Sequence, residues 1–524
     1  MAMNRRHALR ALVASAGAIA TSRSVRVFAA EPAIVSTTAG KIKGFVDANG
    51  VLGFKGVPYG ADSSSYRFRP PVPVKPWTGV RDALEFGAIA PQPGMRGRVM
   101  TEDCLHLNVW TPGVRGTRPV MVWFHPGGYS SGTSNETEAD GARLSRRGDV
   151  VVVTVNHRIN AFGHLYLAEF LGEEYADSGN VGILDLILAL KWVRDNIGQF
   201  GGDPGLVTIF GQSGGGAKSA TLMAMPEAHG LFHRVITMSG QQITASRMSM
   251  ATMHATQLID ALHLSRDRVR DLVTMPTTQI VAASRSAAYY GPVKDGRSLP
   301  RDPFDPDSPP LSASIPMILG NTLGETRTLI GLGNASLFDL TWDRLRPVLE
   351  ENSPFMGLLD RGMVIASYRK WYPNYSPADV FFQATTDSRS WRGQVIEAER
   401  RAMQSEAAPR TWVYQFNWRT PVEGGKWGAH HGLDVPFAFD SVQLVPEKVG
   451  PIAGAKALAA QMSDAFIAFA RSGNPNHSGL PQWPVYDLTM RSTMIFDALS
   501  RTAPDPRGDA RRLFAQVPYV QPGT

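Results

Sequence analysis

The sequence has a single cysteine, Cys104, among its 524 residues. One thiol excludes an intramolecular disulfide and any metal site built from several cysteines. The fold must therefore be held by core packing, and the 43% hydrophobic and 19% charged residues are typical of a globular protein with a sizeable core. We find no internal repeat and no low-complexity segment.

The sequence also has no apolar run of the ~20 residues that a helix needs to cross a membrane. The short apolar run 11–20 follows the pair Arg5-Arg6 and precedes a cleavage-type stretch, Val27-Phe28-Ala29. This order is typical of a twin-arginine export signal, although a short amphipathic tail is the alternative. We predict a signal peptide over residues 1–29, export to the periplasm or secretion through the twin-arginine pathway, and no stable membrane anchor.

Acidic residues are missing from residues 1–29, which carry five arginines. The formal net charge of +7 therefore falls to +2 when this segment is removed. A nearly neutral mature chain gives no reason to expect nucleic-acid binding.

Short apolar runs rich in β-branched residues alternate with helical segments through the chain. A hairpin is predicted at Asn49-Gly50, after N-terminal antiparallel strands. The predicted strands of a parallel sheet are 120–124, 150–155, 207–210, 235–238, 315–319, 412–416 and 493–496. The predicted helices are 185–197, 218–225 and 456–471, with further helical insertions in 248–310 and 337–408. This pattern predicts an α/β fold with a large, mostly parallel, doubly wound sheet, helical cap insertions and a single domain over residues 30–524.

A Gly-x-Ser-x-Gly pattern at residues 211–215 joins a predicted strand to a predicted helix. This context exposes a serine, here Ser213, as a nucleophile. Taken alone, the pattern fits an unreactive glycine-rich turn as well. A reactive serine needs a base, an acid to orient that base, and N–H donors for the oxyanion.

Candidates for all three follow in the chain. Gly127 and Gly128 lie directly after a strand, where backbone N–H groups can bind an oxyanion, but a structural turn fits them equally. Glu325 follows the strand 315–319, although most loop glutamates only confer solubility. His430 and His431 follow later still, as the order serine, acid, histidine requires. No cysteine or acidic residue near them has ligand spacing, so a zinc site is not expected.

Several ordered stretches resemble the type-B carboxylesterases, the cholinesterase-like branch of the α/β-hydrolases. They are Phe54–Tyr59, Glu102–Trp110, Asn156–Arg158, Gly179–Asp185 and Phe200–Pro204. The resemblance covers essentially the whole predicted mature chain. It implies an α/β-hydrolase fold and a bacterial, exported member of that family.

The resemblance also implies roles for individual residues. It makes Ser213 the nucleophile, Glu325 the orienting acid and His431 the base. The oxyanion donors that it implies are the backbone N–H groups of Gly127, Gly128 and Gly214. It places Ser239 beside the triad, where either a hydrogen bond to the triad or a simple structural role fits. No metal or organic cofactor is implied.

The sequence departs from the family pattern at four positions. Pro126 replaces a glycine of the oxyanion loop, Gly214 replaces alanine, and Gln212 replaces glutamate. Ala90 stands near the position of the usual disulfide partner of Cys104. None of these changes removes a catalytic group.

The expected function is that of a serine carboxylesterase that cleaves a small-molecule ester through an acyl-enzyme. A non-catalytic cholinesterase-like binding protein is one alternative, and a lipase, thioesterase or amidase with the same triad is another. Five aromatic residues are candidates for a substrate pocket and equally for ordinary packing: Tyr129, Phe162, Trp391, Trp427 and Phe437. The sequence makes no prediction of oligomeric state or of the preferred ester.

Overall fold

The computed structural model describes residues 33–95, 97–285 and 289–521. The predicted signal peptide, residues 1–29, lies outside these described residues. Within them, no helix is long and apolar enough to span a membrane.

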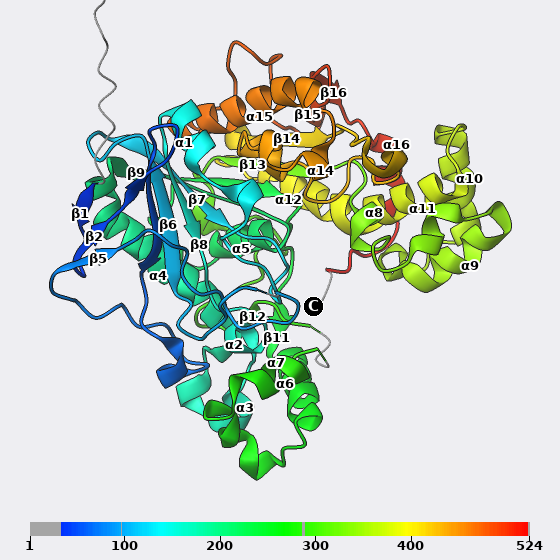
Figure 1. Cartoon of the computed structure of the whole chain (residues 1–524). Helices are drawn as coiled ribbons and strands as arrows, with labels where there is room; N and C mark the ends of the chain where they lie inside the picture. The colour runs from blue at the N-terminus through cyan, green and yellow to red at the C-terminus, as the bar shows by residue number, and fades with distance from the viewer. Residues whose placement is uncertain (1–32, 96, 286–288, 522–524) are drawn as a thin grey trace, which may run out of the picture.

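An eleven-stranded sheet forms the centre of the molecule (Figure 1). In spatial order its strands are β16 (Arg501–Pro504), β15 (Ser492–Phe496), β14 (Thr411–Phe416), β13 (Met317–Thr322), β10 (Arg234–Met238), β9 (Gly202–Gln212), β7 (Arg118–Phe124), β8 (Val151–Val155), β6 (His106–Thr111), β4 (Leu52–Pro58) and β3 (Phe45–Val46). The strands from β15 to β8 are parallel, and antiparallel strands flank them at both ends. The predicted mostly parallel sheet with N-terminal antiparallel strands is confirmed.

Side chains alternate between two cores on opposite faces of this sheet. In β7, Val120 and Val122 belong to one core cluster, whereas Met121 and Trp123 belong to the other. The first core includes residues of α4 (Val181–Asn196) and α5 (Gly214–Leu222), and the second includes residues of α15 (Ile452–Ser472). Burial on both faces explains why these strands are continuously apolar.

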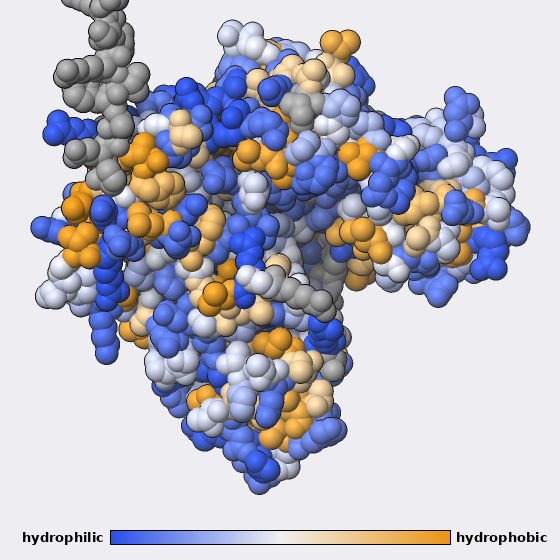
Figure 2. Space-filling view, in the orientation of Figure 1, coloured by the Kyte–Doolittle hydropathy of each residue, from blue (hydrophilic) through white to orange (hydrophobic). Residues whose placement is uncertain are grey.

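Two helical insertions project from the sheet (Figure 1). One contains α6 (Met248–Ala261) and α7 (Thr277–Ala283). The other contains α9 (Trp342–Asn352), α10 (Arg361–Trp371) and α11 (Pro377–Thr386), which share a core of their own. Figure 2 shows the surface hollowed between these two lobes. A π-helical turn, Asp387–Trp391, then leads into α12 (Arg392–Met403), which packs against β13 and β14.

The structure differs from the sequence prediction in several elements. Helix α5 begins at Gly214 rather than at residue 218, because its glycines allow backbone to approach where a side chain would collide. Strand β6 was not predicted, since polar residues interrupt it. One of them, Asn108, is satisfied inside the fold by Gly56 and Thr154. The antiparallel edge strand β16 was also not predicted.

Cys104 is buried and unpaired. It lies in the same core cluster as Ala90, which leaves no sulfur at the position of the usual partner.

Candidate active site

Ser213 lies at a sharp turn between β9 and α5. Its backbone is in a rarely populated region, with φ 55° and ψ −125°, and its N–H donates to the carbonyl of Met238 at 2.7 Å. A Cβ at Gly211 would come within 2.4 Å of the backbone of Gly215, and a Cβ at Gly215 within 1.9 Å of the Phe124 carbonyl oxygen. The two glycines are therefore required for the turn, and Ser213 remains partly exposed at its apex.

The Glu325 carboxylate is fully buried just beyond the end of β13. Its Oε1 accepts hydrogen bonds from Ser239 Oγ at 2.6 Å, Asn321 Nδ2 at 3.1 Å and the Thr322 N–H at 2.7 Å. Its Oε2 meets Nδ1 of His431. Burial alone would raise the pKa of Glu325, but the charge of His431 and these hydrogen bonds lower it below its ordinary value. The acid is therefore ionised at neutral pH.

The loops that carry the acid and the base are joined directly. The Gly324 N–H donates to the carbonyl of Ala429 at 2.8 Å, and Gly324 forms a parallel bridge with His430. His431 then presents Nδ1 to Glu325, so the neutral ring carries its proton on that nitrogen and Nε2 is the unprotonated acceptor. The neighbouring His430 instead contacts the His431 carbonyl, and burial lowers the pKa of His430 to about 4.

The amide of Gln212, rather than the hydroxyl of Ser213, contacts Nε2 of His431. Gln212 Nε2 lies 3.2 Å from that ring nitrogen and 3.4 Å from Nδ1, so the amide lies against the ring. Among the described residues, no hydrogen bond joins Ser213 to His431. Bonds of this kind are often formed only when substrate binds.

Three backbone N–H groups near Ser213 have no hydrogen-bond acceptor among the described residues. Gly127 and Gly128 have φ of 104° and 64°, and Gly214 follows the serine directly. Their N–H groups donate to no acceptor within the described part of the chain. A Cβ at Gly214 would lie 2.0 Å from the Gly128 carbonyl oxygen, so the loop and the turn are in close contact. Unpartnered backbone N–H groups of this kind are what an oxyanion hole requires.

The loop that contains Gly127 and Gly128, called the oxyanion loop below, is anchored by side chains that no sequence motif indicated. Gln92 accepts from the Gly132 N–H at 2.7 Å and donates to its carbonyl at 2.9 Å. Tyr129 donates its hydroxyl to Gln242 Oε1 at 2.8 Å, and the Gln242 N–H donates to Glu397 Oε1 at 2.7 Å. Burial raises the pKa of Glu397 to about 8, so this carboxyl is protonated at neutral pH.

A buried lysine lies beneath the same loop. Lys218 of α5 donates from Nζ to the His125 carbonyl at 3.3 Å, and burial lowers the pKa of Lys218 to about 7. Its positive charge depresses the pKa of the buried His125 and His157, after the larger effect of burial.

The aromatic candidates separate into different environments. Phe162 and Phe437 are fully buried in the two cores of the sheet, and Phe437 packs edge-on against Phe416. Trp391 belongs to the core of the α9–α11 lobe. Tyr129 supports the oxyanion loop, whereas Trp427 is half-buried against Phe338.

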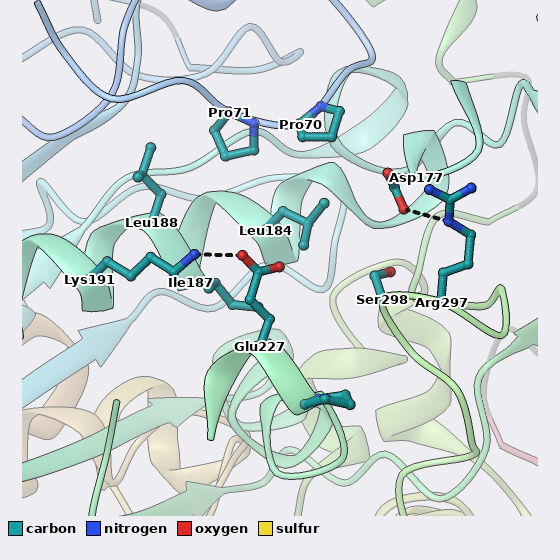
Figure 3. A pocket seen from close by; sticks show the side chains of 11 residues that line it. Pro70, Pro71, Asp177, Leu184, Ile187, Leu188, Lys191, Glu227, Arg297 and Ser298 are labelled. Carbon is teal, nitrogen blue, oxygen red and sulfur yellow. Dashed lines mark hydrogen bonds and ion pairs between the residues drawn. The ribbon is translucent and has the colours of Figure 1, made fainter. Parts of the chain in front are cut away.

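A separate pocket of about 340 Å³ lies along α4 (Figure 3). Leu184, Ile187 and Leu188 form its apolar wall. Its charged groups are already paired, Lys191 with Glu227 and Arg297 with Asp177. The pocket contains none of the candidate catalytic residues. Within the described residues, no group of three or more His, Cys, Asp or Glu side chains is arranged to hold a metal ion.

The parallel sheet, the serine on a strand-to-helix turn and the glutamate–histidine pair beyond later strands define an α/β-hydrolase. The model of the carboxylesterase family matches residues 31–504. The para-nitrobenzyl esterase of Bacillus subtilis (strain 168) is 32% identical over 91% of this chain and 98% of its own length. The phenmedipham hydrolase of Pseudarthrobacter oxydans is 30% identical over 86% and 92%.

A solved structure gives the same result. Carboxylesterase EST55 of Geobacillus stearothermophilus at pH 6.2 superimposes with a TM-score of 0.82 and 33% identity, over 92% of this chain and 99% of that chain. The chain belongs to the carboxylesterase family, and it is a carboxylic ester hydrolase.

Proposed function

We propose that the chain acts as a serine carboxylesterase through an acyl-enzyme on Ser213, with His431 as the base and Glu325 as the acid that orients it. The observation that carries this proposal is the contact between the buried Glu325 and the half-buried His431, whose ring lies beside Gln212 at the Ser213 turn. An ionised glutamate on Nδ1 stabilises the imidazolium that forms when Nε2 accepts a proton.

The reaction begins when the Ser213 hydroxyl donates a hydrogen bond to Nε2 of His431. The serine oxygen then bonds to the ester carbonyl carbon as its proton passes to Nε2. The N–H groups of Gly127, Gly128 and Gly214 hold the resulting oxyanion. Collapse of this intermediate breaks the bond to the alcohol, which leaves with the proton from His431. Water repeats the two steps on the acyl-enzyme and releases the carboxylic acid.

The first test compares wild type with S213A, H431A and H430A on 4-nitrophenyl acetate. Loss of a nucleophile or base should reduce kcat by about 10³-fold or more. Among the described residues, the His430 side chain hydrogen-bonds only to the His431 carbonyl, so H430A is the matched control and should retain far more activity than H431A. Equal rates for wild type and S213A, or for the two histidine variants, would contradict the assignment.

Labelling with a fluorophosphonate probe separates this function from the non-catalytic binding protein. The probe forms a covalent bond only with an activated serine, so wild type should be labelled and S213A should not. Lipases, thioesterases and amidases use the same groups. An ester is favoured among these substrates because its alkoxide leaving group needs less protonation than an amine.

We also propose that residues 30–524 form one catalytic domain behind an export signal in residues 1–29. In support, the strands of the main sheet are spread through the sequence from Phe45 to Pro504, so no shorter segment contains the whole sheet.

A further inference from the structure

Lys218 has no exposed surface and lies in the second turn of α5, five residues after Ser213. Its Nζ donates to the His125 carbonyl at 3.3 Å and lies 5.8 Å from the centre of the Tyr129 ring. Within the part of the chain that the structure describes, it has no second hydrogen bond and no ion pair. The contact with the His125 backbone is therefore the main interaction of a fully buried ammonium group.

The rings around this ammonium group supply no negative charge. The His125 ring stacks on that of His157, with centroids 4.7 Å apart, and the His164 ring meets Tyr129 edge-on at 5.1 Å. Burial lowers the pKa of all three histidines, that of His164 to about 3, so each is neutral at pH 7. Burying a charge with so little compensation destabilises the fold, and burial accordingly lowers the pKa of Lys218 to about 7.

The carbonyl that accepts from Lys218 lies at the start of the oxyanion loop. His125 directly follows β7 and precedes Gly127 by two residues. A Cβ at Gly215 would lie 3.0 Å from the His125 carbonyl oxygen, so this end of β7 lies against the first turn of α5. Lys218 is three residues further along α5, and residues three apart lie on the same side of a helix. The lysine therefore connects the helix that begins at the serine turn with the start of the oxyanion loop.

Pro126 makes the segment between His125 and Gly127 stiff. Its ring restricts φ to about −65°, and its carbonyl accepts a hydrogen bond from Nδ1 of His125 at 2.8 Å. A Cβ at Gly132 would lie 2.2 Å from the Pro126 carbonyl oxygen, so the far end of the loop packs on the same residue. A displacement of the His125 carbonyl would therefore displace Gly127 and Gly128 as well.

We propose that Lys218 is a positioning residue for the oxyanion hole, because its hydrogen bond to the His125 carbonyl keeps the Gly127 and Gly128 N–H groups in place while the oxyanion forms. This inference rests on the proposed function, since Lys218 acts through the loop. Its contribution is made in the transition state, whereas the buried charge destabilises the resting enzyme. Groups that reduce stability in this way are typical of sites where activity depends on them.

The test is K218M, which keeps a side chain of similar length and removes the ammonium group. On 4-nitrophenyl hexanoate we expect kcat to fall about 10- to 100-fold and KM to change less than about 3-fold, because oxyanion interactions are made mainly in the transition state. K218Q retains an N–H donor and should recover part of kcat. The urea midpoint of K218M should not fall below that of wild type, since the substitution removes a buried charge that has no anionic partner.

The inhibitor 1,1,1-trifluoroheptan-2-one measures the oxyanion hole separately. The Ser213 oxygen bonds to its carbonyl carbon, the serine proton passes to His431, and the ketone oxygen becomes an oxyanion with no leaving group to expel. K218M should raise the inhibition constant by about the factor by which it lowers kcat/KM. The matched control is S219A, because Ser219 is equally buried on α5 and, among the described residues, donates only to the Gly215 carbonyl of its own helix, at 3.0 Å. S219A should leave kcat and the inhibition constant unchanged.

Two outcomes would overturn the inference. In one, K218M has the kcat and the inhibition constant of wild type. In the other, K218M unfolds at lower urea than wild type or does not fold, which assigns Lys218 a structural role. Either result leaves the proposed function standing. A wild-type protein that cleaves no ester and takes up no fluorophosphonate probe would instead overturn the proposed function, and this inference with it.

Discussion

At the residue scale, Gly214 and Gly128 bring the serine turn and the oxyanion loop into close contact. Alanine is usual at position 214 in the family that the sequence resembles, yet a Cβ here would lie 2.0 Å from the Gly128 carbonyl oxygen. The glycine therefore lets the oxyanion loop approach the serine turn more closely than an alanine would.

We predict that G214A displaces the oxyanion loop and lowers kcat on 4-nitrophenyl acetate about 10- to 100-fold, because misplaced donors stabilise the oxyanion less. Steady-state kinetics measure this directly. G198A is the control, since a Cβ at Gly198 would meet nothing within 4 Å and should leave kcat unchanged. An unchanged kcat in G214A would show that the loop adjusts without loss.

The sequence named the candidate triad because its residues lie in ordered motifs, and the structure places Glu325 against His431. It gave no indication of the contact between Gln242 and Glu397. These residues lie 155 positions apart in the chain. Their contact depends on tertiary packing, so no local pattern could reveal it.

At the element scale, the sequence predicted those strands whose side chains are buried on both faces of the sheet. The segments that form β7 and β8 are apolar on both faces, so they were predicted as strands from their composition. Strand β6 was not found, because the partners of its polar Asn108 come from β4 and β8. The start of α5 was misplaced because glycine has a low helix propensity, which the close packing at the turn overrides.

The link from α12 to the oxyanion loop contains a titratable group, Glu397, so we expect the activity to depend on pH. Glu397 on α12 accepts a hydrogen bond from the Gln242 N–H, and the Gln242 side chain accepts one from the Tyr129 hydroxyl. Burial raises the pKa of Glu397 to about 8, with the charges of Arg400 and Arg401 opposing. A carboxyl whose pKa is raised on folding stabilises the fold fully at acidic pH, and this contribution is lost as pH rises through about 8.

We therefore predict that wild type loses stability progressively as the pH rises from 4.5 to about 8, and loses kcat as the pH passes about 8. The variant E397Q, which mimics the protonated acid, should show neither loss. Urea unfolding and kcat at a series of pH values measure both. The variant E399Q controls for a general loss of negative charge on α12, because Glu399 is paired with Arg491 near the surface. Parallel pH profiles for wild type and E397Q would contradict the prediction.

At the scale of the whole molecule, a single large sheet with cores on both faces stabilises the fold without a disulfide. The lone Cys104 is buried and pairs with nothing, so folding does not require an oxidising compartment. This property suits a protein that folds in the cytoplasm and is then exported through a twin-arginine pathway. A paired arginine and a short apolar run at the N-terminus are the sequence features of that route.

We predict that replacing Arg5 and Arg6 with lysine stops export, because the pathway recognises the arginine pair itself and not its charge. Fractionation of a bacterial host, followed by fluorophosphonate labelling, should show active wild-type enzyme in the periplasm or medium and the double variant in the cytoplasm. The mass of the exported enzyme should correspond to a chain beginning near residue 30. Replacing Arg23 and Arg26 in the same way is the control, since it makes the same chemical change outside the pair and should leave export intact. Equal export of both double variants would exclude the twin-arginine route.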